Sequence, residues 1–104
     1  MDKNPGKNFA PGAPPIPGDI VVSVMGRDKG RYFIVIDASS QYVYLADGDI
    51  RKLDRPKKKK IKHTRHTGMK DEWIAAQIAS GQKLTNSQLR KTIAGLPCDD
   101  ADDV

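Results

Sequence analysis

The fold is decided by one stretch of the chain, 18-GDIVVSVMGRDKGRYFIVI-36. Residues 20–24 place apolar side chains at every second position, which is the spacing of one face of a β-strand. Residues 31–36 form a second run that is rich in β-branched and aromatic side chains. Two glycines, Gly26 and Gly30, flank polar residues between the runs, a composition typical of a tight loop. The stretch therefore predicts a strand, a loop and a second strand.

Further short strands are expected downstream. Residues 42–46 predict a third strand. Asp47-Gly48 is a hairpin signal because both central positions of a type I′ turn need positive φ, and it predicts a fourth strand over residues 50–53. A fifth short strand is expected around Ile61. Short strands joined by small turns predict a mainly β fold, a small SH3-like barrel over residues 18–65.

The first two strands carry apolar residues on both faces of the pleat, so one outer face needs a cover. Two short helices within residues 66–96 are expected to provide it. The first is predicted to begin at the acidic pair 71–72 and to end at Gly81. The second begins with a capping box, in which Thr85 is the N-cap and Gln88 the third helical residue. Helices this short are marginal alone in water, so they must pack on the barrel, on each other or on a partner.

The two ends of the chain differ from its middle. Residues 1–17 hold five of the seven prolines, which predicts a flexible arm; a proline-rich ligand for an SH3 or WW partner is the alternative. Residues 97–104 hold four Asp and no basic residue, which predicts an acidic disordered tail that competes for the basic surface.

Composition also suggests where the protein is found. No apolar run approaches the roughly 18 residues needed to cross a membrane. The first 17 residues lack the apolar segment of a signal peptide. The single cysteine, Cys98, excludes an intramolecular disulfide and fits a reducing compartment. We therefore expect a soluble cytoplasmic protein without a membrane partner.

Positive charge is concentrated in the middle of the chain. The formal net charge is +5, whereas residues 26–65 carry 12 Lys and Arg against five Asp. Residues 51–65, the basic segment, hold nine Lys and Arg and one Asp. Packed like charges repel, and a polyanion relieves the repulsion and gains entropy by releasing counterions. The density favours nucleic-acid binding; a solvated charge run and a nuclear-localisation signal at residues 57–60 are the alternatives.

Aromatic residues offer a second kind of contact. Tyr42 and Tyr44 lie two apart and point the same way, so both face outward if Val43 and Leu45 face the core. Outward tyrosines could stack on unpaired bases, and packing in the core or against a helix is an equally open interpretation. Trp73 is expected to anchor the first helix by packing.

Residues for metal binding or catalysis are sparse in the sequence. His63 and His66 lie three apart, but no carboxylate or thiol cluster accompanies them, so no metal site is predicted. No nucleophile, base and orienting group form a known motif. We therefore expect no catalytic residues, no metal and no cofactor.

Residues 18–31 resemble a KOW motif, the strand–loop–strand unit of SH3-like barrels in ribosomal proteins and transcription elongation factors. With residues 42–48 and 57–63, the chain resembles a narrower group, short KOW-domain RNA-binding proteins similar to archaeal and eukaryotic large-subunit ribosomal proteins of the fourteen-e type. The resemblance covers about residues 18–64. Many KOW motifs carry a glycine three residues after the Lys-Gly pair, where this chain has Phe33.

The resemblance implies RNA binding without catalysis, in a protein associated with the ribosome or with ribosomal RNA, where ribosomal proteins are expected neighbours. Contacts dominated by lysine read charge and shape more than sequence. Carried onto this chain, the RNA-contacting residues are Arg27, Lys29, Arg31, Arg51, Lys52, Arg55, Lys57, Lys58, Lys59, Lys60, Lys62, His63 and Arg65.

A second function remains open at this point. The SH3-like surface, Trp73 and the two helices could form a protein-interaction module instead. Such a module would depend on apolar residues such as Ile78 and Leu89. Charge reversal at residues 57–60 separates the two functions, because only RNA binding requires those lysines.

Overall fold

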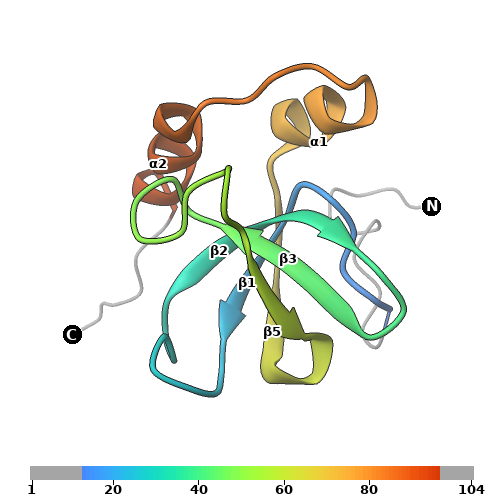
Figure 1. Cartoon of the computed structure of the whole chain (residues 1–104), viewed down its shortest axis with the longest axis vertical. Coiled ribbons are helices and arrows are strands. Elements are labelled where there is room, and N and C mark those ends of the chain that lie inside the picture. Colours follow the sequence, from blue (N-terminus) through green and yellow to red (C-terminus); the bar gives the residue numbers. More distant parts are fainter. Residues whose placement is uncertain (1–12, 97–104) are drawn as a thin grey trace.

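A computed structural model describes residues 13–96 of the chain. The acidic tail and the first 12 residues of the expected proline-rich arm lie outside the described residues. The elements, in chain order, are β1 (Asp19–Ser23), β2 (Tyr32–Ala38), β3 (Tyr42–Ala46), β4 (Lys57–Lys60), the 3-10 helix η2 (Ile61–His63), β5 (Thr64–Lys70), α1 (Glu72–Ala79) and α2 (Asn86–Ala94) (Figure 1).

The strands form one antiparallel sheet in the order β4-β3-β2-β1-β5. The expected mainly β fold followed by two short helices is therefore confirmed. The sheet is open, because its edge strands β4 and β5 share no ladder in the described part of the chain. Strands β1, β2 and β3 lie where the alternating apolar pattern places them, within one or two residues at each end.

The predicted fourth strand at residues 50–53 is wrong. Residues 47–56 form a loop, and the fourth strand is the lysine run itself. The cause is local, since the carboxylate of Asp47 accepts hydrogen bonds from the N–H groups of Asp49 and Arg51, both at 2.9 Å. The N–H of Leu53 donates to the Asn86 side chain of α2 at 2.8 Å. Side chains therefore take the N–H groups that a strand would have used for a ladder.

The chain around Ile61 is also not a strand. It forms η2, and β5 follows directly, where no strand is predicted and before the expected start of the first helix at residues 71–72. β5 pairs with β1 from Ser23↔Thr64 to Asp19↔Lys70, and the register shifts between Ile20 and Val21. The sequence signal was weak because β5 carries few large apolar side chains. Pairing with the buried β1 decides its conformation.

Two apolar clusters lie on opposite faces of the sheet. The inner cluster joins β1, β2 and β3 and consists of Val21, Phe33, Val35, Val43 and Leu45. The second cluster consists of Ile20 and Ile34 from the sheet together with Ile74 of α1 and Leu89 of α2. The expectation that the helices cover one outer face is confirmed, and Figure 1 shows both helices on the same side of the sheet. Close packing is visible at Gly18, where an added Cβ would lie 2.5 Å from the Cβ of Ala75.

Both helices begin with side-chain caps. The Asp71 carboxylate accepts from the N–H of Ile74 at 2.9 Å and from the hydroxyl of Thr92 on α2 at 2.6 Å. The predicted capping box of α2 is confirmed, with the N–H of Gln88 donating to Thr85 and the N–H of Thr85 donating to the Gln88 side chain. These caps satisfy N–H groups that have no partner within the helices.

Candidate nucleic-acid interface

The pleat of β4 divides its four lysines between two faces. In the antiparallel ladder with β3, Lys59 is paired with Val43 and Lys57 with Leu45. Directly paired residues point to the same face. Lys57 and Lys59 therefore lie on the face of the inner apolar cluster, to which Val43 and Leu45 belong.

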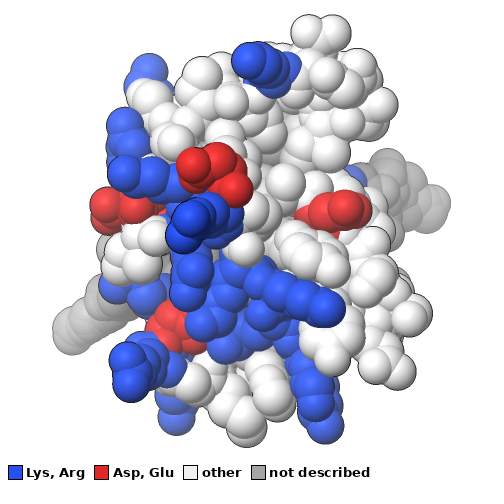
Figure 2. Space-filling model, in the orientation of Figure 1, with Lys and Arg blue, Asp and Glu red and all other residues white. Residues whose placement is uncertain are grey.

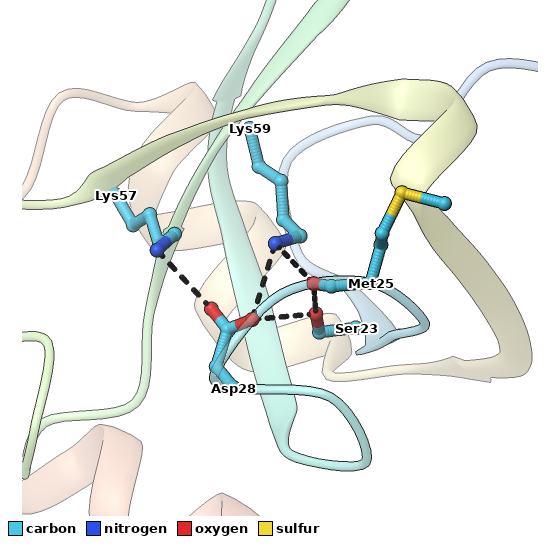
Figure 3. A network of polar contacts seen from close by, with 5 residues as sticks. All are labelled: Ser23, Met25, Asp28, Lys57 and Lys59. Carbon is cyan, nitrogen blue, oxygen red and sulfur yellow. Dashed lines mark hydrogen bonds and ion pairs between the residues drawn. The ribbon is translucent and has the colours of Figure 1, made fainter.

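The two inward lysines are bound within the molecule (Figure 3). Lys59 is only 8% exposed, and its ammonium donates to the Met25 carbonyl at 2.8 Å and to the Asp28 carboxylate at 3.1 Å. The Lys57 ammonium lies 3.5 Å from the other carboxylate oxygen of Asp28. The Ser23 hydroxyl donates to the same carboxylate at 2.7 Å. These contacts hold the β1–β2 loop against β4.

Asp28 is the centre of this network, and its ionisation follows from its neighbours. Burial by itself would raise the pKa of the carboxyl. Hydrogen bonds from Ser23 and Lys59, together with the charges of Lys59 and Lys57, outweigh burial and hold the pKa of Asp28 below its ordinary value of 3.8. Asp28 is therefore ionised at neutral pH and neutralises much of the charge of the two inward lysines.

The outward side of β4 has the opposite character. Lys58 is paired with Tyr44 and Lys60 with Tyr42, so these four side chains share the outer face of β3 and β4. Both lysines are exposed, both tyrosines are partly exposed, and the Lys58 ammonium lies 4.4 Å from the centre of the Tyr42 ring. Within residues 13–96, no carboxylate pairs with Lys58 or Lys60. We call these four residues the lysine–tyrosine face.

The sequence left open whether Tyr42 and Tyr44 face outward. They do, because Val43 and Leu45, which alternate with them, are buried.

The space-filling view shows Lys and Arg side chains gathered in a broad band across one face of the molecule, with few acidic side chains among them (Figure 2).

The thirteen predicted contact residues differ in exposure. Lys59 is buried, and Arg51, Lys57 and His63 are half-buried. Arg27, Lys29, Arg31, Lys52, Arg55, Lys58, Lys60, Lys62 and Arg65 are exposed. Because Lys59 is enclosed and bound to Asp28, it is a structural residue and not an RNA-contacting one.

Asp28 also connects two basic regions that are separate in sequence. Arg27, Lys29 and Arg31 lie on the β1–β2 loop on either side of Asp28, and the Asp28–Lys59 bond holds that loop to β4. The loop conformation depends on Gly26 and Gly30, whose φ angles are +92° and +90°. The sequence contains both groups of cations, and the structure holds the loop against the inward side of β4.

A third group of cations lies on the loop that precedes β4. Arg51, Lys52 and Arg55 belong to the loop 47–56, which packs on α2. The Arg90 guanidinium of α2 donates to the Gly48 carbonyl at 2.7 Å. In the described part of the chain, no hydrogen bond or ion pair links these three residues to β4.

The remaining candidate residues have structural contacts. His66 lies 2.9 Å from the Asp19 carboxylate through Nε2, and its Nδ1 accepts from the N–H of Gly68 at 2.8 Å. Among residues 13–96, no group of three or more His, Cys, Asp or Glu is placed to hold a metal ion. In the same residues, no helix has the length and apolar character to cross a membrane.

One expectation for the helices is wrong, and two residues named for the protein-interaction alternative pack inside the fold. Trp73 is 50% exposed and does not anchor α1, because Ile74 is the residue of that helix that is buried against the sheet. Leu89 is completely buried and Ile78 packs on the same cluster, so neither offers a free docking surface. Of the apolar residues named for a protein partner, only Trp73 is largely exposed.

Sequence reasoning missed the role of Asp28 and Ser23. The signal that could have found them was the alternation of β4, which turns every second lysine toward the core and requires an acidic partner there.

No protein-family model and no curated protein matches this chain.

Proposed function

We propose that this protein binds RNA through the lysine–tyrosine face, with further contacts from the cations of the β1–β2 loop that Asp28 holds to β4. The observation that carries the proposal is that Lys58 and Lys60 are exposed beside two outward tyrosines, whereas the carboxylate nearest the run is already bound to Lys57 and Lys59. The proposal includes no reaction.

The chemistry of this face suits a nucleic acid. Unpaired ammonium groups bind phosphate oxygens and release counterions from the polyanion. Tyrosine rings at alternate positions of one strand offer stacking surfaces for unpaired bases. A face with both features favours RNA with single-stranded or looped segments over a regular duplex, whose bases are not available for stacking.

The proposal also includes a finer fold, a small SH3-like barrel of the KOW type. Its support is the connection between the two edge strands. In a flat sheet β4 and β5 would lie four strand spacings apart, about 19 Å. The three residues of η2 join their ends and span only about 8 Å. The ladders also place Lys60 near the Ala38 end of β2 and Thr64 near its Tyr32 end, so the whole sheet must curl strongly, as a barrel does.

The KOW resemblance extends the proposal to a cellular setting. The RNA would be ribosomal or ribosome-associated, ribosomal proteins would be neighbours, and the protein would act in the cytoplasm. The support for this part is the motif at residues 18–31 together with the lysine run that follows it.

The test is a charge reversal on the outer side of β4. The double variant Lys58→Glu/Lys60→Glu removes two phosphate-binding groups and adds two repulsive charges, so we expect at least a tenfold loss of affinity for a hairpin RNA with an unpaired loop. The matched control is Lys83→Glu/Lys91→Glu, which makes the same change in net charge at exposed positions of the helical region and should change affinity little.

Salt dependence gives a second readout in the same assay. If about four phosphates are engaged, the log–log slope of affinity against salt should be roughly −3 to −4 for the wild-type protein. Affinity without salt dependence, or equal losses in both double variants, would refute the proposed face. Capture of a partner that survives nuclease treatment and is lost in Trp73→Ala would support the protein-interaction function instead.

A further inference from the structure

An open pocket of about 880 Å³ adjoins the lysine–tyrosine face. It lies where the β2–β3 turn meets η2, the start of β5 and the segment 13–15 that precedes β1. Its volume is within the range of about 300–1,000 Å³ that is typical of sites for small organic ligands. Lys60 belongs both to its wall and to the lysine–tyrosine face, so the two surfaces are continuous.

Three cations belong to the polar part of the wall. Lys60, Lys62 and Arg65 are exposed and line the pocket, and none of them pairs with a carboxylate within residues 13–96. No Asp or Glu is among the lining residues. Ammonium and guanidinium groups that converge without a counterion are typical of phosphate recognition. Ser40 and Gln41 add neutral hydrogen-bonding groups at the β2–β3 turn.

The rest of the wall is apolar. Pro14 and Pro15 line the pocket, and so does Ile61 of η2. Rings and branched side chains of this kind offer flat apolar contact to a base or a sugar. A phosphate site next to an apolar wall matches the two parts of a nucleotide.

We propose that this pocket binds one nucleotide unit, with its phosphate at Lys62 and Arg65 and its base or sugar against Pro14 and Ile61. The inference rests on the proposed function, because the unit would belong to the RNA held by the lysine–tyrosine face. A free mononucleotide has the same chemistry and is the other source that the experiment distinguishes.

The first experiment maps the pocket on the wild-type protein by NMR. Backbone amide shifts are followed while uridine monophosphate, inorganic phosphate or a short oligouridine is added. We expect the monophosphate to shift amides of residues 40–41 and 60–66, and the oligouridine to shift the same amides at lower concentration. Shifts by inorganic phosphate at the same concentration as the monophosphate would overturn the nucleotide assignment. Tighter binding of the monophosphate than of the oligouridine would identify the free nucleotide as the source.

The second experiment fills the pocket without changing charge. Ser40→Trp places a bulky ring at the wall, and we expect it to weaken oligouridine binding about tenfold, the scale of losing the contacts of one nucleotide. Ser39→Trp is the control, because Ser39 is exposed in the same turn but does not line the pocket.

The outcomes separate this inference from the proposed function. If oligouridine binds to the wild-type protein without shifting the pocket amides, or binds equally to both tryptophan variants, the pocket inference fails and RNA binding stands. If neither oligouridine nor the hairpin RNA binds at all, the proposed function fails as well. The wild-type titration decides the matter even if Ser40→Trp does not fold.

Discussion

Neighbouring lysines of β4 have opposite environments. Lys59 is enclosed at the edge of the inner cluster and is bound to Asp28 and to a backbone carbonyl. Lys60, the next residue, is exposed and shares its face with Tyr42. The two residues are of the same type and differ only in the face of the strand to which the side chain points. Charge density alone therefore does not identify a binding surface, because half of this run contributes to the fold.

The difference also indicates how the structure tolerates so much positive charge. The inward lysines are compensated by Asp28, whose removal would leave a buried ammonium without a counterion. The outward lysines are solvated and contribute little to stability. Substitutions on the two sides should thus affect different measurements.

The largest effect is expected on the inward side. Asp28→Ala leaves Lys59 buried with only the Met25 carbonyl as partner, and it should lower the free energy of unfolding by about 3 kcal/mol. Urea denaturation measures this directly. The control is Asp54→Ala, which removes an exposed carboxylate and should cost less than about 0.5 kcal/mol. Equal losses in the two variants would show that the Asp28 network does not stabilise the fold.

A smaller effect should separate adjacent residues under one substitution. Lys59→Met should cost about 1 kcal/mol of stability and leave the salt dependence of RNA binding unchanged. Lys60→Met should leave stability within about 0.5 kcal/mol and reduce the steepness of the log–log salt dependence by about 0.7–0.9, the value of one phosphate contact. Urea denaturation and a salt series on both variants give the answer. If Lys59→Met reduces the salt dependence as much as Lys60→Met does, the assignment of Lys59 to the fold and of Lys60 to RNA binding is wrong.

The smallest effect concerns pH. The pKa of Asp28 lies below 3.8 in the folded protein because Ser23, Lys59 and Lys57 favour the carboxylate. Below pH 3.8 the unfolded chain binds a proton at Asp28 that the folded protein does not bind. The stability that ionised Asp28 contributes is therefore fully present above the pKa of the unfolded chain, and it is lost as the pH falls through the pKa of the folded protein. The stability difference between the wild-type protein and Asp28→Asn should thus be constant near neutral pH and narrow below 3.8. A difference that does not vary with pH would contradict this assignment.

Much of the fold could be predicted because its signals are local. The strands β1, β2 and β3 contain alternating or continuous apolar residues, and the capping box at Thr85 needs only two side chains in the correct spacing. β4 lacks such a signal, because four lysines have no apolar alternation. Its strand conformation comes from the ladder with β3 and from the Lys59–Asp28 bond, which are contacts between distant parts of the chain.

The candidate site could be predicted only in outline. The sequence indicates a basic region and two tyrosines that point the same way, and the structure puts them on one face. It does not reveal which lysines are neutralised, because that depends on a carboxylate about thirty residues earlier in the chain. The pocket next to this face depends on three stretches of the chain, residues 13–15, 40–41 and 60–66, and has no sequence signal of its own.

The repetition of one residue in β4 has a consequence for how the ladder finds its alignment. If β4 slipped by two residues against β3, lysines would still lie on both faces over most of the strand. The repeated side chains therefore hardly specify a unique register. The register must be specified by residues outside the repeat or by contacts of single lysines. Ile61 is one such residue, since its N–H donates to the Gln41 carbonyl at 2.9 Å and its side chain packs on the inner cluster. Ile61 and the Lys59–Asp28 bond together therefore fix the alignment of four identical residues along β3.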